Sequence, residues 1–354
     1  MNQIDEYLRE MLEKGGSDLH ISVQAPPRVR ISGSLEILRH YCFEADQVEQ
    51  IMQEITNQSN WDRFLKNKDL DQAYEIPGVA RFRTNFFFNH WGIAAVFRQI
   101  PTNIESLDEL ELPQILKKIA RLNEGLVLVT GPTGSGKSTT LAAIIDFINT
   151  HQSKKIITIE DPIEFVHPQK KSLILHREIL EHSHSFANAL RSAFRSDPDI
   201  ILIGEMRNQE TMKLALTCAA MGILVFATLH TNNAPKTIDR IVDAFDAEQQ
   251  NQIRIMLADS LQAVVSQLLC KKKGGGRIAV HEILLAHEAL PQTIRSGSLS
   301  NIVNIINGNR EAGMISMDSN LRELLDQDFI SPEEAYMKAS EKALFASLLH
   351  KTYN

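Results

Sequence analysis

An eight-residue run constrains this chain more than any other part of its sequence. Residues 131–138 fill every specified position of the pattern G-x-x-x-x-G-K-[ST]. The apolar run at 126–129 before it predicts a buried strand, and the apolar spacing over 138–147 predicts a helix. A strand, a glycine-rich loop and a helix N-terminus in this order direct backbone N–H groups and the positive end of a helix dipole at one place.

Such a loop suits a polyphosphate. Lys137 would reach the β- and γ-phosphates, and the Ser138 hydroxyl would ligate Mg²⁺. The alternative is a glycine-rich turn that binds nothing, and the flanking strand and helix disfavour it. We therefore predict that the chain binds a nucleoside triphosphate with Mg²⁺. The predicted nucleotide-binding residues are Gly131, Pro132, Thr133, Gly134, Ser135, Gly136, Lys137, Ser138 and Thr139.

Composition sets broader bounds. A chain of 354 residues has room for about two domains, and 43% hydrophobic with 23% charged residues is ordinary for a soluble globular protein. The net charge of −7 argues against a surface dedicated to nucleic acid. Cys42, Cys218 and Cys270 form no C-x-x-C pair, so neither a disulfide framework nor a zinc site is predicted.

The compartment follows from what the sequence lacks. Residues 1–14 are charged throughout and do not resemble a signal peptide. No apolar run approaches the roughly 18 residues that span a bilayer. We therefore expect a cytoplasmic protein whose membrane role, if it has one, comes through partners.

Residues 1–100 are predicted to form a separate α+β domain. An apolar stripe at helical spacing predicts a first helix, which Gly15-Gly16 ends. The other predicted elements are a hairpin of 28–31 and 35–38, a helix over 45–55, and paired strands 79–88 and 91–100 joined at Asn89-His90. Alternation along the first paired strand places one set of side chains, Phe82, Thr84, Phe86 and Phe88, opposite Arg81, Arg83 and Asn85.

Residues 101–113 are predicted to be a linker, and residues 114–290 to be the second domain. Apolar strands at 126–129, 156–159, 200–203 and 224–227 alternate with helical stretches, which is typical of a parallel sheet covered on both faces. One more strand is predicted at 277–284, followed by a helical region over 291–354. Ligands of such sheets bind beyond the carboxyl ends of the strands, so we look for the site there.

Acidic or polar residues follow three of these strands. Phosphoryl transfer to water needs a metal cradle, a group that orients or deprotonates water, and a sensor of the γ-phosphate. Glu205, after the strand at 200–203, is predicted to hold Mg²⁺ directly or through water. Glu160 and Glu164, after the strand at 156–159, are candidates for water activation, and His230 is the candidate sensor. A carboxylate here needs no raised pKa, because positioning matters more than basicity in a loose transition state.

Each of these residues has a second interpretation. Glu160 fits a solvated strand end before a turn. Glu205 fits a surface ion pair with Arg207 or Arg195, and His230 fits a histidine satisfied by its surroundings. Joint placement around one phosphate loop favours the functional interpretation of all three.

Several motifs together resemble a known family. They are the phosphate loop, ITIEDPIEF at 157–165, SDPDIILIGEMR at 196–207 and ATLHT at 227–231. This set resembles the secretion-ATPase superfamily, and within it the match is closest to the type IV pilus retraction motors. GGSDLH at 15–20, Arg81-Phe82-Arg83 and the run at 237–242 resemble the same proteins, so the resemblance covers nearly the whole chain.

The resemblance implies an α/β architecture: a PAS-like N-terminal domain joined to a RecA-like P-loop ATPase core with a helical C-terminal tail. It also implies a homohexameric ring with ATP between the two domains. In that family Glu164 corresponds to the catalytic base and Glu205 to the Walker B residue. Arginines of the N-terminal domain contact the phosphates, and Arg81, Arg83 and Arg98 are the candidates. The alternative for these arginines is a solvated sheet face that deters aggregation.

The function that the resemblance implies is an ATP-hydrolysing motor for pilus retraction and twitching motility, held at the inner face of the inner membrane by a platform protein. One departure favours an accessory subunit that acts through a paralogous pilus ATPase. Retraction motors carry AIRNLIR, whereas residues 289–295 read ALPQTIR, with Pro291 where a helix would otherwise continue. A nucleic-acid-translocating motor is a third possibility, which the net charge of −7 and the lack of a basic stripe disfavour.

Overall fold

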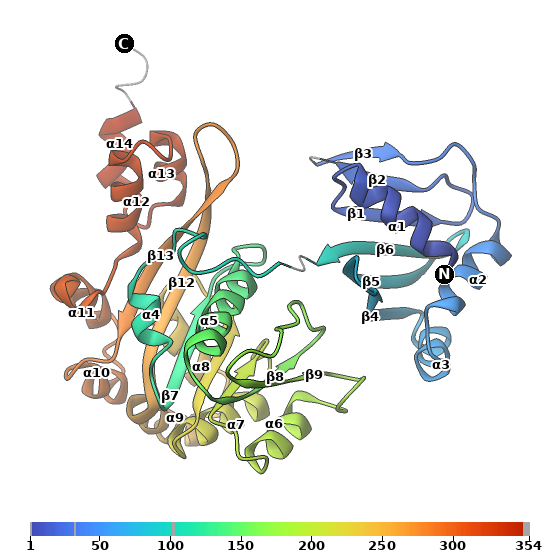
Figure 1. The fold of residues 1–354 in the computed structure, drawn as a ribbon. Helices are drawn as coiled ribbons and strands as arrows, with labels where there is room; N and C mark the ends of the chain where they lie inside the picture. Colours follow the sequence, from blue (N-terminus) through green and yellow to red (C-terminus); the bar gives the residue numbers. More distant parts are fainter. Residues whose placement is uncertain (1, 32, 101–102, 350–354) are drawn as a thin grey trace. The chain divides into compact units, whose positions relative to one another are not determined.

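The computed structural model describes residues 2–31, 33–100 and 103–349. Residues 101 and 102 of the predicted linker and residues 350–354 of the predicted helical tail lie outside this part of the chain. The chain divides into two compact units, Met1–Asn103 with Pro162–Val166, and Ile104–Asp161 with His167–Asn354 (Figure 1). The domain boundaries expected at residues 100, 113 and 290 stay predictions.

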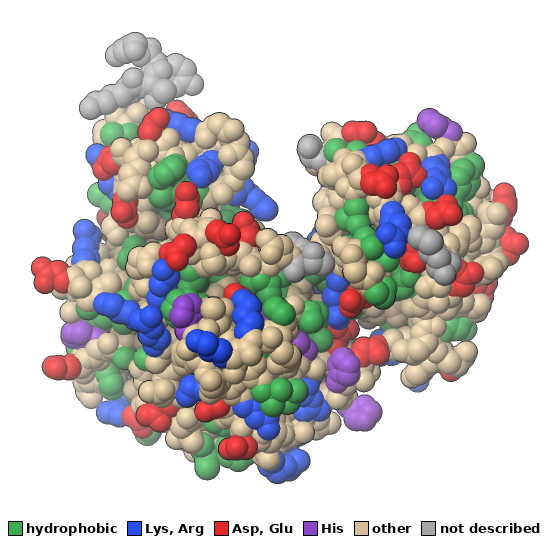
Figure 2. All heavy atoms as spheres, in the orientation of Figure 1, with side chains coloured by type: hydrophobic (Ala, Val, Ile, Leu, Met, Phe, Trp, Pro, Cys, Tyr) green, Lys and Arg blue, Asp and Glu red, His purple; other side chains and the backbone are tan. Residues whose placement is uncertain are grey.

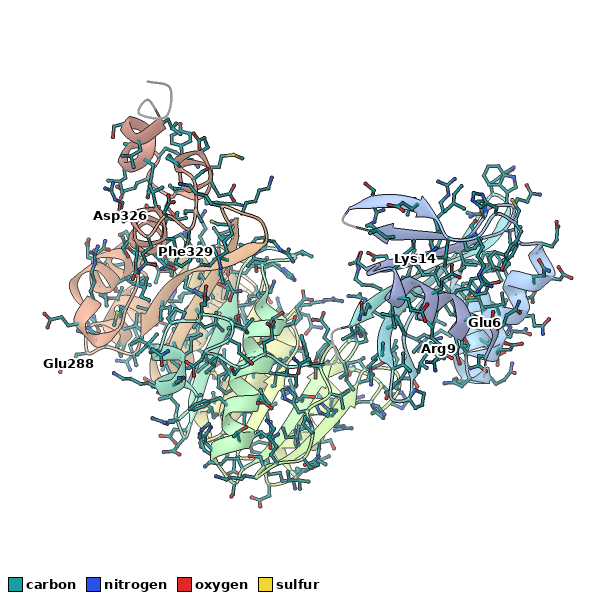
Figure 3. The ribbon with its side chains drawn as sticks, turned by 45° about the horizontal axis from the view of Figure 1, so that its top comes forward. Glu6, Arg9, Lys14, Glu288, Asp326 and Phe329 are labelled. Atoms are coloured by element: carbon teal, nitrogen blue, oxygen red, sulfur yellow. The ribbon has the colours of Figure 1, made fainter. Side chains whose placement is uncertain are left out.

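The first unit is a six-stranded antiparallel sheet with three helices, in the strand order β3-β2-β1-β6-β5-β4. Apolar side chains from all three helices and from one sheet face form a single core. Glu6 of α1 and Lys14, which directly follows this helix, are exposed (Figure 3). The elements are α1 (Gln3–Glu13), β1 (Asp18–Ser22), β2 (Arg28–Ile31), β3 (Ser34–Ile37), α2 (Ala45–Glu54), α3 (Gln58–Asn67), β4 (Asp69–Ile76), β5 (Ala80–Asn89) and β6 (Gly92–Ile100).

The alternation predicted for β5 is confirmed at Phe82, Thr84 and Phe86, which are all fully buried. Phe88, near the strand end, continues the same face: it stacks on Phe64 with ring centroids 5.0 Å apart, although it is 37% exposed. The hairpin turn lies one residue later than predicted. Asn89 still belongs to β5, and its Oδ1 accepts hydrogen bonds from the backbone N–H groups of Trp91 and Gly92.

The second unit is built on a seven-stranded sheet in the order β13-β12-β7-β11-β10-β8-β9. All neighbouring strands are parallel except β12 and β13. The elements up to the last strand are α4 (Ile115–Ile119), β7 (Gly125–Thr130), α5 (Lys137–His151), β8 (Lys155–Glu160), β9 (Leu173–Glu178), α6 (Phe186–Phe194), β10 (Ile200–Ile203), α7 (Gln209–Ala220), β11 (Leu224–Leu229), α8 (Ala234–Val242), α9 (Ala247–Ser260), β12 (Leu261–Lys271) and β13 (Arg277–Leu285).

Two hydrophobic cores cover the two faces of this sheet. Leu126 and Leu128 of β7 belong to the core shared with α6 to α11, whereas Val127 and Val129 belong to the core shared with α4 and α5. The predicted parallel sheet covered on both faces is therefore confirmed, with the mixed α/β class. The sequence analysis did not predict two of its strands, β9 and β12.

The C-terminal region is helical, as predicted. Its elements are α10 (Leu290–Ser296), α11 (Asn301–Gly308), a short 3₁₀ turn (Arg310–Ala312), α12 (Met317–Asp326), α13 (Pro332–Lys338) and α14 (Ala343–Leu349). The interpretation of Pro291 as a helix interruption is wrong. Pro291 stands in the first turn of α10, where a helix needs no proline N–H, so it starts the helix rather than breaking it.

Charge is mixed over the surface. On the face drawn in Figure 2, acidic and basic side chains are interspersed on each unit. Within the described part of the chain, no helix combines the length and the apolar character needed to cross a membrane.

Candidate functional site

The phosphate-loop motif connects the end of β7 to the first residue of α5, so the strand, loop and helix predicted from the sequence are present. Two loop glycines pack directly against Gln267 of β12. A Cβ on Gly131 would lie 2.2 Å from the backbone oxygen of Gln267, and a Cβ on Gly136 would lie 2.8 Å from its Nε2. Both glycines also have positive φ angles, 148° and 85°. A side chain at either position would force the loop away from β12.

Lys137 lies inside this loop. Its side chain is buried, and its Nζ donates to the carbonyl oxygens of Gly131 at 2.9 Å and Pro132 at 3.1 Å. The Ser135 hydroxyl is also buried, and its Oγ has no hydrogen-bond partner among the described residues. Ser138 and Thr139 follow in the first turn of α5 and are half-buried. A glycine-lined loop with an ammonium and an unsatisfied hydroxyl fits a polyphosphate ligand.

Gln267 is a loop-positioning residue that the sequence analysis missed. Its Nε2 donates to the carbonyl oxygen of Ser135 at 2.7 Å, and its Oε1 accepts from the Thr140 hydroxyl at 2.7 Å. His281 Nε2 lies 3.2 Å from the same Oε1. All four residues are buried, and burial lowers the pKa of His281 to about 4, so this imidazole is neutral at pH 7. The available signal was a polar pair, Ser266-Gln267, inside the apolar run 263–269.

The ends of β10 and β11 bring two predicted residues together. Glu205 Oε1 lies 3.1 Å from Nε2 of His230. The other carboxylate oxygen of Glu205 lies 2.9 Å from Nε of Arg207, which is one of the two surface partners considered above. Because β11 lies between β7 and β10 in the sheet, this pair lies at the same carboxyl edge as the phosphate loop.

Glu160 ends β8, the next strand along the edge. Gly204 after β10 packs closely against it, since a Cβ at Gly204 would lie 3.3 Å from the Glu160 Cα. The Glu160 carboxylate is mostly buried and lies 3.9 Å from Nδ1 of His176 on β9. Glu160 is therefore held within the sheet edge rather than being a fully solvated strand end.

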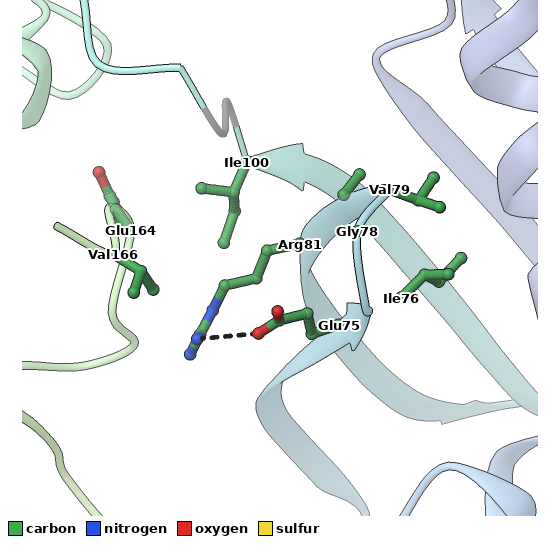
Figure 4. A pocket seen from close by; sticks show the side chains of 9 residues that line it. Glu75, Ile76, Gly78, Val79, Arg81, Ile100, Glu164 and Val166 are labelled. Atoms are coloured by element: carbon green, nitrogen blue, oxygen red, sulfur yellow. Dashed lines mark ion pairs between the residues drawn. The ribbon is translucent and has the colours of Figure 1, made fainter. Parts of the chain in front are cut away.

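Glu164 belongs to the segment that packs with the first unit. There it lines a cavity of about 280 Å³ together with Arg81, Glu75 and Val166 (Figure 4). Arg81 Nη1 lies 3.7 Å from Oε2 of Glu75, its cross-strand neighbour on β4. A catalytic-base candidate and an arginine candidate thus line one cavity within this unit.

The other two candidate arginines lie on the same sheet face as Arg81. Arg83 is two residues along β5 and stands directly opposite Arg98 on β6. Arg98 Nε donates to Asp18 Oδ1 at 2.7 Å. Burial raises the pKa of Asp18, but hydrogen bonds from Ser17 and Arg98 and the Arg98 charge outweigh it, so this pKa lies below its ordinary value. Arg98 therefore has a hydrogen-bond partner within the sheet.

Together these features define a class of protein: an α/β nucleotide-binding enzyme with a phosphate loop and acidic residues at the carboxyl edge of its sheet. The family model for type II/IV secretion system proteins matches residues 1–336. The chain belongs to this family.

Named relatives are similar over nearly the whole chain. The type IV pilus retraction ATPase PilT of Pseudomonas aeruginosa is 46% identical over 95% of this chain and 98% of its own length. A twitching motility protein of Neisseria gonorrhoeae is 49% identical over 88% of this chain and 84% of its own. The type IV pilus ATPase PilU of P. aeruginosa is 37% identical over 95% of this chain and 88% of its own.

A solved structure supports the same assignment. The crystal structure of the pilus retraction motor PilT with bound ADP has a TM-score of 0.89 and 40% identity, and the match covers 96% of this chain and 98% of that one. The family and these relatives show that the chain is a nucleotide-binding ATPase.

Proposed function

We propose that this chain is the ATP-hydrolysing subunit of a hexameric motor that powers type IV pilus retraction. The observation that carries the proposal is the phosphate loop, in which Lys137 Nζ donates to the Gly131 carbonyl oxygen, together with the Glu205–His230 pair at the same sheet edge. Identity to the retraction ATPase PilT (46%) exceeds identity to PilU (37%) over the same share of the chain.

The loop residues 131–139 would hold the phosphates of ATP. Ser138 and Glu205 would hold Mg²⁺, which when bound neutralises charge on the phosphate oxygens. Among the described residues no group of three or more His, Cys, Asp or Glu side chains could hold a metal. This fits a Mg²⁺ site made jointly by one or two protein groups, phosphate oxygens and water.

We assign the base to Glu164 and the phosphate-contacting arginine to Arg81. Glu164 lines an open cavity together with Arg81, whereas the Glu160 carboxylate is mostly buried beside His176. Arg81 is favoured over Arg98 because Arg81 lines the same cavity as Glu164, whereas Arg98 pairs with Asp18. His230 would report the state of the γ-phosphate to Glu205, its neighbour at 3.1 Å.

The remaining parts of the proposal rest on the family. They are the domain division at 1–100, 101–113, 114–290 and 291–354, the homohexameric ring, and docking on an inner-membrane platform protein at its cytoplasmic side. No nucleic-acid partner is proposed.

A second candidate function is that of an accessory subunit working through a paralogous motor. The specific observation is the altered segment 289–295, which begins α10 and keeps a single arginine of the motif, Arg295. Arg295 Nη2 lies 2.5 Å from Asp259 of α9. Loss of retraction in cells that already have a weakened paralogue, but not in cells with an intact one, would favour this reading.

The proposal is tested by ATP turnover of the purified full-length chain. Lys137→Ala is expected to abolish turnover, and Glu164→Gln is expected to lower kcat about 10²-fold or more while ATP stays bound. Glu160→Gln is the matched control, since it removes the same charge four residues earlier. If Glu160→Gln stops turnover and Glu164→Gln leaves it normal, the assignment of the base is wrong.

A further inference from the structure

The segment that carries Glu164 is irregular. Residues 161–166 form neither helix nor strand, and they run between the end of β8 and His167. The segment therefore lies outside the strand ladders of both sheets. A base that must be placed within a fraction of an ångström needs other groups to hold it.

One histidine links the residue just after the segment to the strand just before it. His176 lies on β9 in direct register with Thr158 of β8. Its Nδ1 lies 2.9 Å from the Thr158 hydroxyl and 3.9 Å from Oε1 of Glu160, the residue just before the segment. Its Nε2 lies 3.1 Å from the backbone nitrogen of His167, the residue just after the segment.

These contacts fix the tautomer of His176. A backbone N–H donates and cannot accept, so Nε2 of His176 must be the unprotonated nitrogen that receives the His167 N–H. Nδ1 then carries the hydrogen and donates towards Thr158. Neutral histidine supplies one acceptor and one donor on opposite sides of one ring, so His176 links the His167 N–H to the Thr158 hydroxyl of β8.

The surroundings keep this arrangement in place. Thr158 and His167 are buried, and the His176 side chain is mostly buried. The His167 ring stacks on the His176 ring, with centroids 5.7 Å apart and planes 8° from parallel. Burial lowers the pKa of His167 to about 4, so the stacked ring is neutral at pH 7.

We propose that His176 is a positioning residue for the acidic segment: it ties the His167 backbone, just after the segment, to Thr158 of β8, and so restricts where Glu164 can lie. The inference rests on the proposed role of Glu164 for its catalytic consequence, but not for the structural one. Loss of the His176 contacts is expected to lower kcat with little effect on KM for ATP, because the phosphate loop lies on other strands.

Two substitutions separate the two contacts. Glutamine places its carbonyl oxygen close to where Nε2 of histidine lies, so His176→Gln can still accept the His167 N–H. Asparagine is shorter and reaches towards Thr158, so His176→Asn keeps that contact and loses the other. His176→Ala loses both. His182→Ala is the matched control, because His182 also accepts a backbone N–H, from Glu178 at 2.9 Å, but this bond does not involve residues 161–167.

The direct readout is hydrogen exchange of the full-length protein in a peptide spanning residues 161–170, with the melting temperature measured alongside. We expect exchange in this peptide at least tenfold faster in His176→Ala and His176→Asn, and close to wild type in His176→Gln and His182→Ala. Turnover should follow the same order, with kcat reduced tenfold or more in the first two. Unchanged exchange in His176→Ala, or no rescue by His176→Gln, would overturn the proposal.

The positioning role of His176 and the assignment of Glu164 as the base can be tested separately. If Glu164→Gln turns over normally while His176→Ala still accelerates exchange, the base assignment fails and the positioning role stands. If Glu164→Gln is inactive while His176→Ala keeps wild-type exchange and kcat, the positioning role fails and the base assignment stands.

Discussion

Replacing Gln267 with leucine is expected to loosen the phosphate loop. The substitution removes the donor to Ser135 O and the acceptor of the Thr140 and His281 hydrogen bonds, all in a buried site. A buried polar group left without its partner costs about 1–3 kcal/mol. Three groups left without a partner therefore destabilise the loop by at most about 3–9 kcal/mol.

Part of that energy will appear in the stability of the fold and part in nucleotide affinity. Each 1.4 kcal/mol that falls on binding weakens ATP affinity about tenfold. Gln267→Glu should weaken ATP binding more than Gln267→Leu does, although the glutamate side chain has nearly the same shape as glutamine. Its carboxylate can still accept from Thr140 and His281, but it places a negative oxygen against the Ser135 carbonyl.

The assay is titration of purified protein with a fluorescent ATP analogue, together with denaturant unfolding. Gln262→Leu is the control, because Gln262 lies on the same strand beside Gly125 rather than beside the loop. Wild-type affinity and stability in Gln267→Leu would refute the view that this amide positions the loop.

Three further predictions test other parts of the site. Gly131→Ala should lower the free energy of unfolding by about 1–3 kcal/mol more than Gly134→Ala, because its Cβ would meet Gln267 O at 2.2 Å whereas a Cβ on Gly134 has open space; equal melting curves would contradict this. His230→Ala should leave ATP binding intact and lower kcat, since His230 contacts Glu205 and not the loop; a KM effect alone would oppose it. The free energy of unfolding should fall as pH drops from 6.5 towards 4, by up to about 1.4 kcal/mol per pH unit for each of His281 and His167. In the folded chain both histidines have a pKa of about 4, so the unfolded chain binds protons that the folded chain excludes. Urea unfolding across this pH range tests the direction of the change, and His281→Gln should make the dependence on pH less steep.

Local patterns explain what could be predicted from the sequence. The phosphate loop and the four central strands are contiguous runs, and the parallel topology follows from their alternation with helices. The acidic and polar residues at the strand ends then meet at one edge by geometry alone. For this reason Glu205 and His230 could be expected at the same edge as the loop, and the structure places their side chains 3.1 Å apart.

Tertiary contacts explain what was missed. Gln267 acts on a residue 132 positions earlier in the chain, and nothing in its local sequence indicates that partner. His176 lies on β9, whose short run does not alternate clearly enough to predict a strand, and its role depends on the register with β8. The sequence does not distinguish Arg98 from Arg81 as a phosphate-contacting residue. In the structure Arg98 donates a hydrogen bond to Asp18, which lies 80 positions away in the chain.

The most direct test of the central claim is imaging of surface pili in cells whose single copy of this gene carries Glu164→Gln. A retraction motor with its chemistry in the acidic segment predicts dense, static pili, as in a strain that lacks the gene, with Glu160→Gln compared alongside. Normal pilus numbers with normal retraction would contradict the claim and assign retraction to another ATPase.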